Sequence, residues 1–116
     1  MQPQEVAEHA ATLMLEKKAK DVVILDLRGL SGATDYFVIG SAENEVQVKA
    51  ISESVVSGLE STGTRIYHLE GYSERRWVLL DCIDIVVHIF LEELREFYGL
   101  ERLWGDAPLE RRIDKE

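Results

Sequence analysis

Residues 77–104 read WVLLDCIDIVVHIFLEELREFYGLERLW, and this stretch decides the fold of the chain. It opens with two apolar runs, residues 77–80 and 85–91, which are separated by a short segment containing two aspartates. Apolar runs that are rich in Val and Ile predict strands covered on both faces. A helical spacing of apolar residues follows, and Gly99 predicts where that helix ends. One further apolar turn then contains Leu100, Leu103 and Trp104.

The two apolar runs predict a β-hairpin with a two-residue loop at Cys82 and Ile83. In this register Trp77 pairs directly with His88, so both side chains are expected on one face of the sheet. The same register places Asp81 opposite Asp84. Two carboxylates in that position repel each other, so we expect fraying or a bulge at this end of the hairpin.

The chain before this hairpin predicts two helices and three strands. The helices are expected over residues 3–19 and from Ser41 to about Gly63, and the strands over residues 22–27, 36–39 and 65–69. Ser41 is the expected N-cap of the second helix, with Asn44 as a weaker capping-box partner. The order helix, strand, strand, helix, strand, strand, strand, helix predicts an α/β (α+β) fold with a mixed sheet flanked by helices.

Composition bounds the function. The chain has 116 residues, of which 46% are hydrophobic, so we expect one domain over residues 1–104 and a charged, loosely held tail over residues 105–116. A net charge of −9 disfavours free DNA or RNA as the main ligand and suits a basic protein partner, although acidity also serves solubility.

The number of cysteines and the hydropathy of the sequence predict the cellular compartment of the protein. The single cysteine, Cys82, cannot form an internal disulfide, and its apolar surroundings favour an inert core thiol in a reducing cytoplasm. The sequence has no run of 18 apolar residues and no signal-peptide pattern, so a membrane partner is not expected.

Three features of the sequence are candidates for a chemical role. Gly40 and Ser41 before a helix resemble the phosphate-binding turn of nucleotidyltransferases, which also need two metal-binding carboxylates on the next strand. Residues 65–69 contain none, so transfer chemistry is disfavoured and we expect no catalytic residue, metal or cofactor. His88 is either a hydrogen-bonded core histidine or part of a site. The aromatic set is either core or a binding hot spot; it comprises Tyr72, Trp77, Tyr98 and Trp104.

From about Asp21 to Trp104 the chain resembles the ribosomal silencing factor family, also called the RsfS, YbeB or iojap family. The matching pieces, in order, are Thr34-Asp35, Glu70-Gly71, Trp77 with Asp81, Val86-Val87-His88, Arg95 with Tyr98, Leu100-Glu101 and Leu103-Trp104. No single piece is diagnostic, but their order and spacing are specific. The family usually has glycine where this chain has Ile83.

The resemblance implies a nucleotidyltransferase-like fold without catalysis. It also implies a cytoplasmic protein, commonly a homodimer when free, that binds the large-subunit ribosomal protein numbered fourteen in the bacterial series. That binding would block joining of the small subunit and repress translation under nutrient limitation, with little direct rRNA contact. The matched pattern implies the following contact residues: Glu70, Trp77, Asp81, His88, Tyr98, Leu100 and Trp104. The alternatives are a small nucleotidyltransferase-like enzyme using Gly40 and Ser41, and an enzyme subunit that dimerises through the same aromatic residues.

Overall fold

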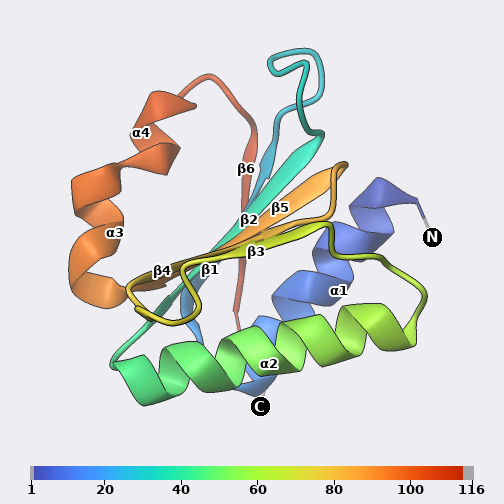
Figure 1. Cartoon of the computed structure of the whole chain (residues 1–116). Coiled ribbons are helices and arrows are strands. Elements are labelled where there is room, and N and C mark those ends of the chain that lie inside the picture. Colours follow the sequence, from blue (N-terminus) through green and yellow to red (C-terminus); the bar gives the residue numbers. More distant parts are fainter. Residues whose placement is uncertain (1, 114–116) are drawn as a thin grey trace.

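The computed structural model describes residues 2–113, apart from the side chain of Phe97, as a six-stranded sheet with helices on both faces (Figure 1). The helices are α1 (Pro3–Glu16), α2 (Glu45–Ser61), α3 (Glu92–Tyr98) and α4 (Leu100–Leu103). The strands are β1 (Lys20–Asp26), β2 (Tyr36–Ala42), β3 (His68–Glu70), β4 (Trp77–Asp81), β5 (Ile85–Leu91) and β6 (Leu109–Arg112). No helix among these residues is long and apolar enough to cross a membrane.

The sheet is mixed, as the sequence predicts, with the strand order β3-β4-β5-β2-β1-β6. β1 and β2 form the expected antiparallel hairpin. β2 and β5 pair in parallel, because α2, β3 and β4 intervene between them and bring the chain back to the same edge of β2. All seven residues of β5 are buried, which confirms that this apolar run is a strand covered on both faces.

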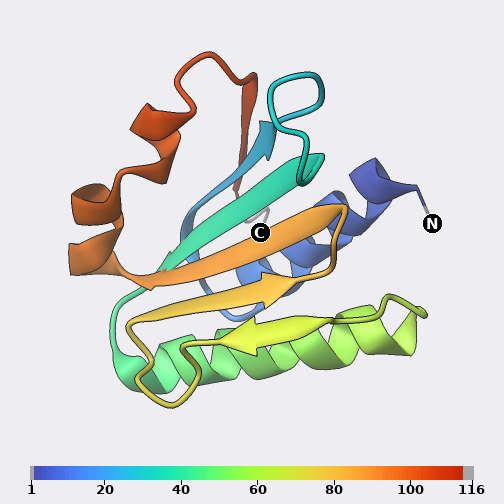
Figure 2. The same cartoon turned by 45° about the horizontal axis from the view of Figure 1, so that its top comes forward.

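The two faces of the sheet carry separate apolar clusters. α1 and α2 cover one face, where they pack on alternate strand residues such as Val38 and Val87. The other face carries a smaller cluster around Ile39 and Phe90, with Trp104 packed against it. Figure 2 shows that α3 and α4 lie over one end of the strands on this face. On the same face, no helix of the described residues covers the rest of β4 and β5.

The β4–β5 register differs from the predicted one by two residues. Trp77 pairs with Phe90 and not with His88, and Asp81 pairs with Val86, so the two opposed carboxylates are avoided. The reason is that the tip of the loop lies one residue further along, at Ile83 and Asp84. The Cys82 N–H donates to the Ile85 carbonyl at 2.9 Å, the Asp84 N–H donates to the Cys82 carbonyl at 3.0 Å, and Ile83 adopts a φ of +72°. A shift of two residues preserves the face, so the prediction that Trp77 and His88 share one face is confirmed.

The predicted start of α2 at Ser41 is wrong. β2 continues to Ala42, because Ser41 pairs with Lys20 of β1 and with Phe90 of β5. Asn44 is the N-cap instead, and its side-chain oxygen accepts the backbone N–H of Gln47 at 2.9 Å. α2 ends as predicted just before Gly63, which has a φ of +87°.

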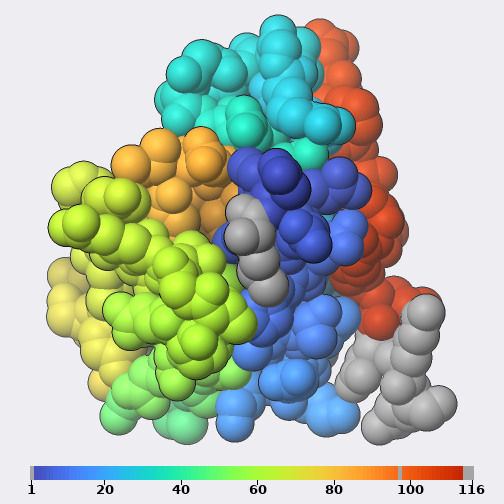
Figure 3. Space-filling view, turned by 90° about the vertical axis from the view of Figure 1, so that its right-hand side faces the viewer, coloured from blue at the N-terminus to red at the C-terminus, as the bar shows by residue number. Residues whose placement is uncertain are grey.

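The prediction that residues 105–116 form a loosely held tail is also wrong for much of that segment. Leu109–Arg112 forms β6, which pairs antiparallel with the outer edge of β1. Ala107 is buried in the smaller cluster, and the Pro108 carbonyl accepts the backbone N–H of Asp26 at 2.9 Å. In the space-filling view α1 lies between α2 and this C-terminal segment (Figure 3), and Arg112 and Glu8 form an ion pair at 3.4 Å. Residues 114–116 of the predicted tail lie outside the described residues.

Candidate protein-binding face

Strand pairing places most of the predicted contact residues on one side of the sheet. Directly paired residues share a face, and the pairs Trp77–Phe90, His88–Leu79 and Asp81–Val86 link β4 to β5. The pair Glu70–Leu79 adds β3, and Ile39–His88 adds β2. We call this side the aromatic face, and it comprises Phe37, Glu70, Trp77, Leu79, Asp81, His88 and Phe90 from the strands, together with Tyr98, Leu100 and Trp104 from the helical end.

A continuous row of rings crosses the aromatic face. Tyr98 lies 4.6 Å from Trp77 between ring centroids, and Trp77 stacks on Phe90 at 4.9 Å. Phe37 meets His88 edge-on at 4.5 Å and Trp104 edge-on at 6.3 Å. Such contacts favour one arrangement of the rings over others, so the row forms a rigid surface rather than a set of independent side chains.

His88 supports this row from beneath. The Trp77 indole N–H donates to His88 Nδ1 at 3.1 Å, so the neutral imidazole carries its proton on Nε2. Burial lowers the pKa of His88 to about 3 and keeps the ring neutral. Only 2% of His88 is exposed, and Nε2 has no hydrogen-bond partner within the described part of the chain. In the free protein His88 therefore lies below the contact surface to which the resemblance assigns it.

The other predicted contact residues lie at or near the surface. Glu70 is exposed on β3, and Trp77 and Asp81 are half-buried on β4. Tyr98 is 44% exposed at the end of α3, and Leu100 and Trp104 are half-buried at the two ends of α4. Sequence reasoning missed two half-buried members of the aromatic face, Phe37 and Leu79. Strand alternation around Trp77 and Asp81 is the signal that identifies Leu79.

Two turns hold the strands of this face in place. Gly71 follows Glu70 with a φ of +79°, and a Cβ there would collide with the carbonyl oxygen of Trp77. At the other end of β4, the Asp81 carboxylate accepts the N–H of Ile83 at 2.8 Å. The first turn therefore requires glycine, whereas the second places a β-branched residue in the left-handed region, where glycine would be unstrained.

A buried arginine connects the helical end of this face to the sheet. The Arg95 guanidinium donates to both carboxylate oxygens of Glu101, at 2.9 and 3.1 Å, and to the Ser41 hydroxyl at 2.9 Å. It also donates to the backbone carbonyl of Lys20 at 3.4 Å. A buried charge is tolerated only when it is paired and hydrogen-bonded, and these contacts meet that requirement.

The same contacts bear on the alternative in which Ser41 binds phosphate. Ser41 lies within β2 rather than at a helix N-terminus, it is buried, and its hydroxyl accepts a hydrogen bond from Arg95. Among residues 2–113 no group of three or more His, Cys, Asp or Glu side chains is placed to hold a metal ion. Cys82 is a buried free thiol, as predicted, and burial beside Asp81 raises its pKa to about 11.

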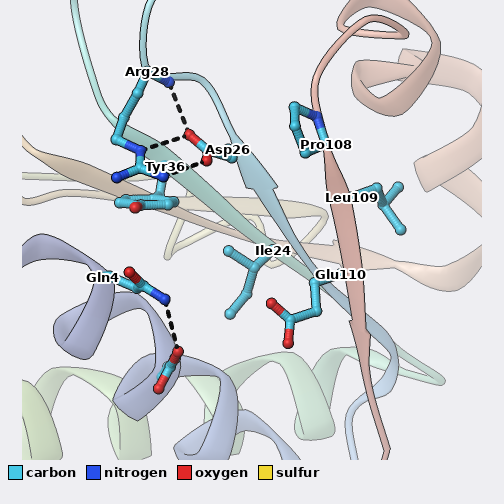
Figure 4. Close-up of a pocket in the computed structure, with 9 residues that line it drawn as sticks. Gln4, Ile24, Asp26, Arg28, Tyr36, Pro108, Leu109 and Glu110 are labelled. Carbon is cyan, nitrogen blue, oxygen red and sulfur yellow. Dashed lines mark hydrogen bonds and ion pairs between the residues drawn. The ribbon is translucent and has the colours of Figure 1, made fainter.

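A small depression of about 140 Å³ lies on the opposite face, between α1 and the β1–β6 edge (Figure 4). Arg28 donates to Asp26 from its backbone N–H at 3.0 Å and from its guanidinium at 3.0 and 2.7 Å, which lowers the pKa of that carboxyl. Gln4 donates to Glu8, one turn further along α1, at 3.4 Å beside the same depression. These polar groups satisfy one another, so the aromatic face remains the stronger candidate site.

The chain is similar to proteins of one family along its whole length. A family model described as "Ribosomal silencing factor during starvation" matches residues 1–116. The "Ribosomal silencing factor RsfS" of Halalkalibacterium halodurans is 43% identical over 108 residues, covering 93% of this chain and 92% of the relative. The protein of the same name from Bacillus subtilis is 39% identical over 109 residues, covering 94% and 92%.

A solved structure agrees with this assignment. The crystal structure of a Chromobacterium violaceum protein superposes with a TM-score of 0.88 at 32% identity, covering 100% of this chain and 91% of that one. Sequence and fold therefore match together rather than in separate segments. This chain belongs to the family of ribosomal silencing factors.

Proposed function

We propose that this chain acts in the cytoplasm by binding, through the aromatic face, a basic protein of the large ribosomal subunit, and that the bound domain then blocks joining of the small subunit. The partner implied by the family resemblance is the large-subunit protein numbered fourteen in the bacterial series. In this proposal the protein represses translation without catalysing a reaction.

The observation that carries the proposal is the placement of the predicted contact residues. Glu70, Trp77 and Asp81 come from two strands, and Tyr98, Leu100 and Trp104 come from the helical end, yet all lie on one face. Aromatic side chains surrounded by polar ones are typical of the residues that dominate binding energy at protein interfaces. A rigid surface of this kind needs little ordering on binding, which favours affinity.

Charge supports a protein partner over direct rRNA contact. The net charge of −9 repels phosphate backbones except where cations of the partner intervene. Acidic groups at the edge of the face, Glu70 and Asp81, suit Lys and Arg side chains of a ribosomal protein. Because such exposed charges are screened over roughly 8 Å at physiological ionic strength, we expect binding to weaken with added salt.

In the free protein, a second copy of the chain is expected to occupy the aromatic face, which gives a homodimer.

The test follows subunit joining on a density gradient with purified subunits. Excess protein is expected to sediment with the large subunit and to reduce the amount of complete ribosomes. Asp81→Lys is expected to reduce both effects, because it introduces a repelling charge on the aromatic face. Glu60→Lys makes the same charge change on α2, over the opposite face, and serves as the matched control.

Two outcomes would contradict the proposal. The first is that the unmodified chain stays at the top of the gradient and leaves subunit joining unchanged. The second is that Asp81→Lys and Glu60→Lys reduce binding equally, since a general effect of net charge would then explain both. Circular dichroism of each variant verifies that the comparison is made between folded proteins.

A further inference from the structure

The helix α4 carries important parts of the aromatic face but buries little of itself. None of its four residues is buried, and Leu103 is 72% exposed. Leu100 and Trp104 are only partly buried against the smaller apolar cluster. Because the stabilisation from burial is proportional to the apolar area removed from water, this packing alone gives α4 a weak hold on the sheet.

The bend before α4 adds freedom rather than constraint. Gly99 ends α3 and begins α4 with a φ of +60°, and glycine is the residue with the widest choice of backbone angles. Arg102 donates to the Glu96 carbonyl across this bend at 2.9 Å, but that contact is exposed and joins only the two helices to each other. It does not connect either helix to the sheet.

Arg95 adds a polar connection between α4 and the sheet to this weak apolar packing. We propose that Arg95 is the positioning residue of the aromatic face, because its guanidinium joins Glu101 of α4 to Ser41 of β2 and to the Lys20 carbonyl of β1. The two parallel hydrogen bonds from Arg95 to the Glu101 carboxylate fix its orientation as well as its distance, which the single ammonium group of a lysine does not do. This inference rests on the proposed function, because it states how the binding surface is held in shape.

The geometry predicts that the two tryptophans respond differently when this contact is lost. Trp77 is held by strand pairing and by its hydrogen bond to His88, and its ring contact at the helical end is with Tyr98 of α3, before the bend at Gly99. None of these contacts involves α4. Trp104 directly follows α4 and meets Phe37 edge-on at 6.3 Å, so its surroundings depend on the angle of that helix. A loosened α4 therefore changes the environment of Trp104 and leaves that of Trp77 as it was.

The chain is suited to the measurement because it has only two tryptophans, both on the aromatic face. Incorporated 5-fluorotryptophan gives two ¹⁹F signals, which Trp77→Phe assigns. In Arg95→Lys we expect the Trp104 signal to shift or broaden while the Trp77 signal stays in place. We also expect affinity for the large subunit to fall about tenfold or more, equivalent to one lost anchoring contact.

Arg28→Lys is the matched control. Arg28 also forks onto a carboxylate, that of Asp26, but at the end of β1 away from α4. Both ¹⁹F signals and the affinity are expected to stay unchanged in this variant. If Arg95→Lys does not fold, Glu101→Gln removes the same ion pair from its more exposed partner and is expected to move the same Trp104 signal.

The positioning role is contradicted if the Trp104 signal of folded Arg95→Lys or Glu101→Gln is unchanged. It is also contradicted if affinity is lost while that signal stays in place, because Arg95 would then act on the partner by another route. These results are separate from a failure of the proposed function. That failure appears as unmodified chain that does not sediment with large subunits, whereas the ¹⁹F spectra are recorded without ribosomes.

Discussion

The indole N–H of Trp77 donates to Nδ1 of His88 across a diagonal of the β4–β5 hairpin, at 3.1 Å. The bond exists only while the imidazole is neutral, since a protonated Nδ1 is a donor and has no lone pair to offer. Burial enforces the neutral state by lowering the pKa of His88 to about 3. Trp77, the aromatic residue of β4, thus depends on a buried histidine that does not titrate in the physiological range.

This relationship predicts a loss of stability in mild acid. Unfolded His88 takes up a proton near pH 6.5, whereas the folded chain resists protonation until about pH 3. The stabilisation is complete above pH 6.5 and is lost as the pH falls below it, by up to about 1.4 kcal/mol for each pH unit. Urea unfolding between pH 7 and pH 5 measures this slope.

His88→Gln removes the titrating group, so its free energy of unfolding is expected to vary less over the same range. His68→Gln is the control, because His68 is exposed on β3 and its removal is expected to leave the slope unchanged. Equal slopes in the unmodified chain and in His88→Gln would show that other groups produce the acid sensitivity.

The loop between β4 and β5 offers a stabilising substitution. Ile83 has a φ of +72° and is 49% exposed, so it carries backbone strain while burying little apolar surface. Ile83→Gly is expected to raise the free energy of unfolding by about 1 kcal/mol, since the strain of the left-handed region is roughly 1–2 kcal/mol and the added chain entropy offsets part of it. Ile83→Ala keeps a Cβ and is expected to bring no such gain, and a gain of the same size in both would point to the side chain rather than to the backbone.

The start of α2 provides a test of the revised cap. Asn44→Ala removes the acceptor for the Gln47 N–H and is expected to destabilise the protein by about 1 kcal/mol. Asn44→Asp retains an acceptor and places a negative charge at the helix N-terminus, so its stability is expected to stay close to that of the unmodified chain. Thermal or urea unfolding of the two variants decides the matter, and equal destabilisation by both would exclude a capping role.

A partly exposed aromatic ring on the aromatic face is expected to matter for binding. Tyr98→Ala removes a ring that stacks beside Trp77, and we expect affinity for the large subunit to fall about tenfold or more, as for other aromatic anchors. Tyr72→Ala removes a tyrosine that hydrogen-bonds Glu53 of α2 on the other side of the sheet, at 2.6 Å, and is expected to bind normally. Quantitative co-sedimentation compares them, and normal binding by Tyr98→Ala would remove Tyr98 from the proposed interface.

The C-terminal strand predicts the effect of a truncation. Removing residues 106–116 uncovers the outer edge of β1 and the cluster that holds Ala107, so we expect a lower unfolding temperature and self-association through the open edge. Removing only residues 114–116 leaves β6 in place and serves as the control. Light scattering and thermal unfolding measure both effects, and a long truncation that behaves like the short one would mean that β6 contributes little.

Much of the fold follows from local patterns. The apolar run of β5, the glycine ends of α2 and α3, and the β1–β2 hairpin were all predictable, because each depends on residues close in sequence. Ser41 was misassigned because a serine at the end of a strand and one at a helix N-cap look alike in sequence. The contacts that distinguish them are distant: pairing with Lys20 and Phe90, and the hydrogen bond from Arg95, 54 residues away. β6 was not predicted because its charged sequence, LERR, shows no alternation of apolar and polar residues. It is held in the sheet by backbone hydrogen bonds to β1.

The candidate site was predictable to a similar degree. The contact residues came from a family pattern, and their common face required the strand register. That register is shifted by two because four residues, rather than the expected two, lie between the paired residues Asp81 and Val86. Alternation alone indicates which side of β4 Trp77 occupies, but it does not reveal that His88 is buried beneath the rings. That burial depends on Phe37 from β2, a strand whose parallel pairing with β5 has no local signal.

The parallel pairing of β2 with β5 also has a consequence for biosynthesis. A chain is synthesised from its N-terminus at about 5–20 residues per second, so the synthesis of β2 is complete several seconds before that of β5, its parallel partner in the sheet. During this interval the β1–β2 hairpin and α1 exist without the strand that later occupies the middle of the sheet. The apolar side chains of Val38 and Ile39 are then open to water or to chaperones. A protein proposed to act on ribosomes therefore completes its own core only when most of its length has left one.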